Sequence, residues 1–166
     1  MTNQRISPVR LTAENLSRFM DLKPKRGQRK WIAPNARTIA QAHYEKGVYL
    51  RGLAVGERPV GLVSLMNICP GHPDLAPGVD SRIASLWRLM IAGPEQGKGY
   101  GSQAMTLVLK RAWVWGSDRV QAFVDPGNEI ALNLYNSFGL TPTGVEEDGE
   151  LELSLTLADE VKSQAG

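Results

Sequence analysis

The spacing of apolar residues changes several times along the chain, and these changes predict alternating strands and helices. Residues 86–91 form a mostly apolar run that is long enough for a buried strand. Over residues 102–115 the apolar side chains recur at helical spacing. The glycine-rich run 93–101 separates these two segments. We therefore expect a central strand, a glycine-rich loop and a helix in direct succession.

The same criteria predict the other elements. Helices are expected over residues 13–22, with Thr12 as the cap, over 36–46 and over 129–138. Strands are expected over residues 5–11, 48–55, 59–67, 119–124, 140–147 and 150–157. The first strand is assigned to a sheet edge because Pro8 has no N–H to donate. This order predicts a mixed α/β sheet in one domain, residues 1–166, with a core over about residues 5–157.

Composition narrows the classes of function. The formal net charge of +2 is too small to indicate nucleic-acid binding, and the basic run 23–30 is interpreted as a solvated loop. Nowhere does the sequence contain 18 consecutive apolar residues, and the lone Cys69 excludes an internal disulfide framework. We therefore expect a cytoplasmic protein that binds neither membranes nor nucleic acid.

The glycine-rich loop carries the clearest chemical signal. Alternate glycines at 97, 99 and 101 let a ligand approach the backbone, and the following helix directs its free N–H groups at the same point. Such a site favours an anion, and Lys98 adds positive charge. The P-loop pattern is absent. Asp118 lies at a suitable distance for a dinucleotide ribose carboxylate, although the glycine spacing fits poorly, and a ligand-free flexible connection is the simplest alternative.

Two motifs resemble those of one family. Residues 96–101 are similar to the Q/R-x-x-G-x-G/A acetyl-CoA motif of the GNAT superfamily of N-acetyltransferases. Asn128, Ala131, Tyr135 and Gly139 match a second pattern of that family, with Leu140 where Phe is usual. The resemblance covers about residues 5–157, and scattered residues such as Asn15 and Gln28 resemble its bacterial diamine and polyamine acetyltransferase branch. It implies a GNAT-like fold, with a six- to seven-stranded mixed sheet flanked by about four helices.

The resemblance also implies a site for acetyl-CoA as co-substrate. The strand 86–91 is expected to bulge away from 119–124, so that the pantetheine arm bonds its backbone, with Met90 or Ile91 polarising the thioester carbonyl. Tyr135 is expected to act on the leaving thiolate; its structural alternative is a core tyrosine with a satisfied hydroxyl. Asn128 can both cap a helix and touch the CoA arm. The implied cofactor-binding residues are Leu89, Met90, Ile91, Gln96, Gly97, Lys98, Gly99, Tyr100, Gly101, Ser102 and Asn128.

The acceptor is expected to be a primary amine that attacks acetyl-CoA directly. The resemblance to the polyamine branch favours a diamine or polyamine. The acidic residues around 146–152 are either a surface that attracts such a polycation or a solvated hairpin tip. The general base is left open among Glu129, Glu147, Glu150 and a water chain. Alternatives are another small amine, an antibiotic or a protein amine, and a CoA-binding sensor without turnover. No metal is expected, because His43 and His72 lack metal-ligand spacing. The sequence leaves open whether the protein forms a homodimer.

Overall fold

One mixed sheet organises the computed structural model, which describes residues 4–157. Its strands in this range are β1 (Ser7–Val9), β2 (Val48–Val55), β3 (Arg58–Ile68), β4 (Ile83–Ile91), β5 (Arg119–Val124), β6 (Thr141–Glu147) and β7 (Glu150–Thr156). Hydrogen-bonded neighbours follow the order β1-β2-β3-β4-β5-β7-β6. β4 and β5 run parallel, whereas β7 runs antiparallel to both β5 and β6.

The helices within the described residues are α1 (Leu16–Met20), α2 (Asn35–Tyr44), α3 (Tyr100–Val114) and α4 (Glu129–Ser137). Two single 3-10 turns, η1 (Arg26–Gln28) and η2 (Gly93–Glu95), lie in the connections. Seven strands and four α-helices confirm the predicted fold class. Over residues 4–157 no helix combines the length and apolar character needed to span a membrane.

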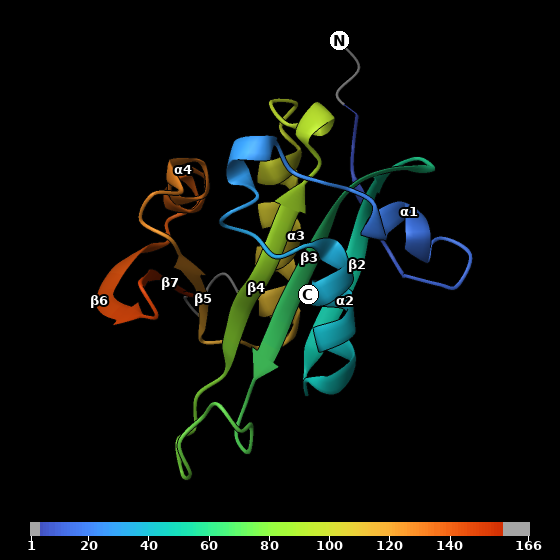
Figure 1. The fold of residues 1–166 in the computed structure, drawn as a ribbon. Helices are drawn as coiled ribbons and strands as arrows, with labels where there is room; N and C mark the ends of the chain where they lie inside the picture. The colour runs from blue at the N-terminus through green and yellow to red at the C-terminus, as the bar shows by residue number, and fades with distance from the viewer. Residues whose placement is uncertain (1–3, 158–166) are drawn as a thin grey trace. The chain divides into compact units, whose positions relative to one another are not determined.

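The chain forms two compact units. The first comprises residues 4–64 and 88–104, and the second comprises residues 65–87 and 105–157. In the first unit β1 pairs with β2 at the sheet edge, as Pro8 predicted, and α1 and α2 lie beside β2 (Figure 1). A Cβ on Gly52 of β2 would lie 2.3 Å from the buried ring of Phe19. Glycine at this position therefore allows α1 to pack closely on the strand.

Helix α1 corrects one prediction, because Thr12 does not cap it. The side chain of Asn15 accepts the Thr12 N–H at 2.8 Å and donates to the Arg10 carbonyl at 2.9 Å. These two bonds close a turn over residues 12–15, and the helix begins only at Leu16. Asn15, rather than Thr12, thus sets the start of the helix.

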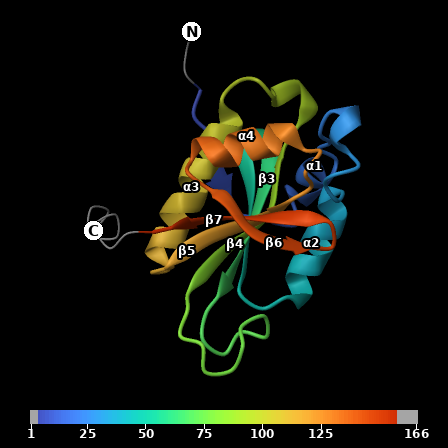
Figure 2. The same ribbon diagram turned by 90° about the vertical axis from the view of Figure 1, so that its left-hand side faces the viewer.

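In the second unit β7 lies between β5 and β6 (Figure 2). The turn before β7 has positive φ at Asp148 and Gly149, 50° and 81°, which suits the right-handed twist of a two-residue hairpin. Buried Glu152 of β7 accepts hydrogen bonds from Arg119 at 3.0 Å and Thr143 at 2.8 Å. It is therefore occupied within the sheet, which removes it from the acidic cluster expected to attract a polycation.

Strand β4 begins at Ile83, three residues before the predicted start. The Asp118 N–H donates to the Arg82 carbonyl at 2.7 Å, and the Asp118 carboxylate accepts the Arg82 N–H at 2.9 Å. This reciprocal pair aligns the starts of β4 and β5. Asp118 therefore serves the sheet, which leaves the dinucleotide interpretation without its carboxylate.

Candidate active site

Strand β4 extends beyond its pairing with β5. The ladder runs from Ile83↔Arg119 to Leu86↔Ala122, and β4 continues for five more residues to Ile91. Toward β3, the Ala92 N–H donates to the Val60 carbonyl at 2.8 Å, and the Met90 carbonyl lies 2.3 Å from where a Cβ on Gly61 would be. Peptide groups of successive strand residues point to opposite edges. The backbone carbonyl of Met90 therefore points toward β3, and the backbone N–H of Ile91 points away from it.

The loop after β4 combines left-handed glycines with open space. Gly97 and Gly99 have φ values of 77° and 81°, and a Cβ on either would meet no protein atom within 4 Å. Helix α3 starts at Tyr100, two residues earlier than predicted, and the Gln103 N–H bonds the Gly99 carbonyl at 3.1 Å. Within the described residues, the N–H groups of Gly97, Gly99 and Gly101 donate to no protein acceptor. This geometry leaves donors and room for an anion.

The Gln96 side chain braces this loop from inside the protein. Its amide and that of Gln28 donate to each other, at 2.7 Å and 3.0 Å. The Gln96 amide also donates to the Ile91 carbonyl at 2.9 Å. Gln96 therefore links the end of β4 to the segment around η1, and its side chain serves the shape of the loop.

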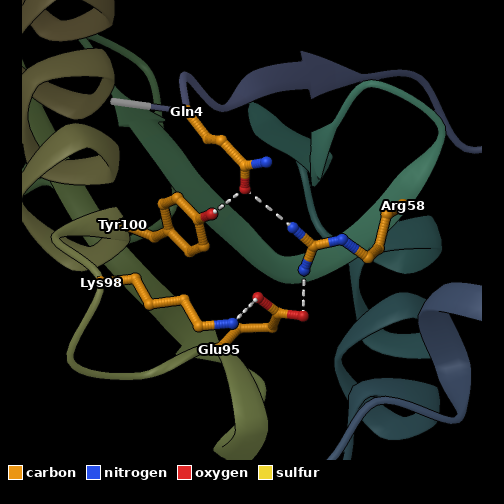
Figure 3. Close-up of polar contacts among 5 residues, drawn as sticks. All are labelled: Gln4, Arg58, Glu95, Lys98 and Tyr100. Atoms are coloured by element: carbon orange, nitrogen blue, oxygen red, sulfur yellow. Dashed lines mark hydrogen bonds and ion pairs between the residues drawn. The ribbon is translucent and has the colours of Figure 1, made fainter. Parts of the chain in front are cut away.

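A chain of polar contacts holds the other side of the loop (Figure 3). Lys98 donates to the Glu95 carboxylate at 2.9 Å, and the other oxygen of that carboxylate accepts from Arg58. Arg58 and the Tyr100 hydroxyl both donate to the Gln4 side-chain oxygen, at 3.1 Å and 3.0 Å. The N-terminal segment, the start of β3 and the loop are thereby joined into one network.

The network changes the acid–base properties of its members. The hydrogen bond from Arg58 lowers the pKa of the Glu95 carboxyl; burial opposes this effect, and Lys98 adds to it. The hydrogen bond to Glu95 in turn raises the pKa of Arg58. Glu95 is therefore a stable carboxylate that holds Lys98 close to the loop.

The predicted cofactor-binding residues differ in what their side chains offer. Lys98 is half exposed but paired with Glu95, and Tyr100 is buried, with its hydroxyl on Gln4. Ser102 is exposed in the first turn of α3. The structure thus brings residues 89–91 and 96–102 together in the first unit, mainly through their backbone. In the described chain no group of three or more His, Cys, Asp or Glu is arranged to hold a metal ion.

Helix α4 carries the remaining predicted residues in the second unit. Asn128 is its N-cap and accepts the Ala131 N–H at 3.3 Å, as expected from the sequence. Tyr135 is buried, and burial raises the pKa of its phenol well above the usual value. Its hydroxyl forms no hydrogen bond to any other part of the described chain. Of the carboxylates considered as a base, Glu129 and Glu147 are exposed and Glu150 is half buried.

Sequence reasoning missed Gln4, Arg58 and Glu95 as parts of this site. Gln4 lies 54 and 96 residues from its partners, and no local pattern joins them. Only the spacing of Glu95 and Lys98, three residues apart, was a readable signal for an ion pair.

A family profile matches the region that contains strand β4, the glycine-rich loop and helix α3. The profile described as "Acetyltransferase (GNAT) family" matches residues 14–140. The chain belongs to the GNAT acetyltransferase family. This membership confirms, at the level of the family, the predicted class of N-acetyltransferase enzymes.

A relative of known name agrees with this assignment. This chain is 30% identical over 140 residues to a mycothiol acetyltransferase of Thermobispora bispora, a match that covers 75% of this chain and 46% of that protein. The chain thus spans about half the length of this relative.

Two solved structures share the fold. An acetyltransferase from Thermus thermophilus matches with a TM-score of 0.69 and 21% identity, covering 95% of this chain and 100% of that one. Spermidine N-acetyltransferase from Vibrio cholerae, solved in complex with CoA and spermine, has a TM-score of 0.69 and 15% identity, with coverages of 95% and 98%.

Proposed function

We propose that the protein transfers an acetyl group from acetyl-CoA directly to a primary amine. The observation that carries this proposal is that β4 continues past its ladder with β5 into a loop with two left-handed glycines and open space beside them. Acetyl-CoA supplies an activated thioester. The backbone of residues 89–91 suits its pantetheine arm, and the N–H groups of residues 96–102 suit its diphosphate.

The alternation of peptide groups along β4 favours Ile91 as the donor to the thioester carbonyl. The Met90 carbonyl lies against Gly61 of β3, so the Met90 peptide is turned toward that strand. The Ile91 N–H points the other way, and the Ile91 carbonyl is fixed by Gln96 at 2.9 Å. A fixed donor stabilises the negative charge that develops on the thioester oxygen during attack.

Tyr135 is proposed as the group that stabilises the leaving thiolate. Burial raises the pKa of its phenol, so the hydroxyl stays protonated at physiological pH. A thiol has a pKa of about 8.5, so complete proton transfer from such a phenol to the thiolate is strongly unfavourable. Tyr135 therefore acts by donating a hydrogen bond. Asn128, at the start of the same helix, is proposed to contact the CoA arm.

The favoured acceptor is a diamine or polyamine. Support comes from the exposed carboxylates Glu146, Glu147 and Asp148 at the β6–β7 turn, which attract cations. A second candidate is a mycothiol-type acceptor, favoured by the 30% identity to mycothiol acetyltransferase.

The test is amine-dependent release of CoA from acetyl-CoA, followed with a thiol-reactive dye. The panel contains putrescine, spermidine, spermine, lysine peptides, aminoglycosides and the acceptor of mycothiol acetyltransferase. Release with one amine class identifies the acceptor. Binding of acetyl-CoA without release under any amine would replace transfer by a CoA-binding sensor, and absence of acetyl-CoA binding would refute the proposal.

Tyr135→Phe separates chemistry from binding in the same assay. We expect kcat to fall by about tenfold to a hundredfold, the value of one directed hydrogen bond in the transition state, with little change in acetyl-CoA affinity. Tyr44→Phe is the matched control, because Tyr44 is 85% exposed. Equal turnover in both variants would make Tyr135 a structural residue.

A further inference from the structure

An open pocket of about 660 Å³ lies in the first unit, beside the turn that follows β4. Residues 92–95 form one wall, Pro59 contributes from β3, and residues 21–26 with Arg29 form the rest. The glycine loop at 97–101 is not part of its lining. The pocket is therefore a concavity separate from the proposed diphosphate site, and we call it the basic pocket.

The basic pocket takes its character from four cations, Lys23, Lys25, Arg26 and Arg29. None of the four forms an ion pair with another residue in the range 4–157. Of the two lining carboxylates, Glu95 is already bound by Arg58 and Lys98 (Figure 3). Only Asp21 remains to balance the four positive charges. This local excess is larger than the formal net charge of +2 of the whole chain.

The backbone that carries these cations is anchored. The Gly93 N–H donates to the Lys23 carbonyl at 2.9 Å, and a Cβ on Gly93 would lie 3.2 Å from the backbone nitrogen of Lys25. The reciprocal Gln28–Gln96 pair fixes the far end of the segment. The run that the sequence indicated as a solvated loop is thus held against residues 92–96, with its charged side chains gathered around one concavity.

We propose that the basic pocket binds the phosphate groups of a small molecule. Unpaired cations in one concavity repel each other within a screening length of about 8 Å at physiological ionic strength, so the site gains most from an anion of more than one charge. Arginine presents a planar fork that fits phosphate oxygens, and lysine adds point charges. A single carboxylate would leave most of the four cations uncompensated.

Two sources can supply such a phosphate. One is a phosphate of acetyl-CoA bound at residues 96–102, and this source rests on the proposed function. The other is a separate phosphorylated molecule, which does not require acetyl-CoA to bind. The experiment therefore measures the pocket first with inorganic pyrophosphate and only then with coenzymes.

The first measurement is calorimetric titration of the full chain with inorganic pyrophosphate. The test variant is Arg26→Gln with Arg29→Gln, and the control is Lys30→Gln with Arg37→Gln, which removes the same charge from neighbouring residues outside the lining. Pyrophosphate can also bind at residues 96–102, so the titration is analysed for two sites. We expect one of these sites to bind at least tenfold more weakly in the test variant and within twofold of the original in the control. Equal affinities in the two variants, or no binding by the unmodified chain, would overturn the proposal. Unchanged melting temperatures exclude unfolding as the cause.

The second measurement identifies the source by comparing CoA with 3′-dephospho-CoA. If the pocket takes the 3′-phosphate of CoA, the test variant loses CoA affinity about tenfold but retains affinity for 3′-dephospho-CoA. If both coenzymes bind the test variant as they bind the control, the pyrophosphate result assigns the pocket to a separate phosphorylated molecule. Failure of both coenzymes to bind the unmodified chain refutes the proposed function, while the pyrophosphate titration still decides the pocket.

Discussion

Gly61 offers the sharpest test of how β3 supports the end of β4. A Cβ on Gly61 would lie 2.3 Å from the Met90 carbonyl oxygen, whereas ordinary contacts of this kind lie at 3.4–4 Å. Gly61→Ala therefore requires the two strands to separate by about 1 Å at this point. The atom that must move belongs to the backbone of a central strand, so no side-chain rotation relieves the clash.

The cost follows from this geometry. Overpacking of a filled core costs about 1–3 kcal/mol, and a backbone clash belongs at the upper end of that range. For a protein of this size each kcal/mol corresponds to about 2–4 °C, so the melting temperature should fall by about 6–12 °C. Because the displaced atom is adjacent to Ile91, affinity for acetyl-CoA should fall as well.

Scanning calorimetry and acetyl-CoA titration measure both effects, and two glycines calibrate them. Gly27→Ala meets no atom within 4 Å and should change the melting temperature by less than about 2 °C. Gly52→Ala clashes with the Phe19 ring instead, so it should destabilise the fold and leave acetyl-CoA affinity intact in the folded protein. A melting temperature of Gly61→Ala within about 2 °C of the original would refute the reasoning.

Three further predictions concern the loop and helix α4. Gln28→Ala and Gln96→Ala should show a coupling free energy of about 1 kcal/mol in a double-mutant cycle of chemical unfolding, because their amides bond reciprocally; additive effects would contradict the pair. Folding lowers the pKa of the Glu95 carboxyl, so the stability that this carboxylate contributes is complete above its ordinary pKa of 4.5 and is lost as the pH falls through the folded pKa. The difference in melting temperature between the original protein and Glu95→Gln should therefore shrink as the pH falls below 4.5. A difference that stays constant with pH would contradict this. Asn128→Ala removes the cap of α4 and should cost about 0.5–2 kcal/mol in chemical unfolding, whereas Asn133→Ala on the same helix, away from its cap, should be nearly neutral.

Local signals in the sequence predicted much of the fold. The strands 48–55 and 119–124 match the structure to the residue, because each is an apolar run bounded by turn residues. The Asp148–Gly149 hairpin and the Asn128 cap were also found, since each depends on residues within a few positions of one another. The start of helix α1 was misplaced because the Asn15 side chain bonds the Thr12 N–H and the Arg10 carbonyl, which places a turn before the helix that the apolar spacing did not indicate.

The sequence predicted the backbone of the candidate site but not the side-chain hydrogen bonds around it. The glycine spacing located the loop, because left-handed φ values demand glycine at 97 and 99. The contacts of Gln4 with Tyr100 and of Gln28 with Gln96 join residues 96 and 68 positions apart. Contacts between single polar side chains at such distances leave no periodic pattern in the sequence, so only the folded chain reveals them.

The distribution of paired and unpaired cations follows from this network. Lys98 and Arg58 share Glu95, so their charges maintain the shape of the loop and are partly compensated before any ligand binds. In the proposed function, an anion at residues 97–101 is therefore held chiefly by backbone N–H groups, whose positions are fixed by the glycines and by α3. The four cations of the basic pocket have no such carboxylate within the described chain, and their charges remain available there. A loss of positive charge at Lys98 should therefore alter the stability of the loop, whereas the same loss at Arg26 should alter ligand affinity alone.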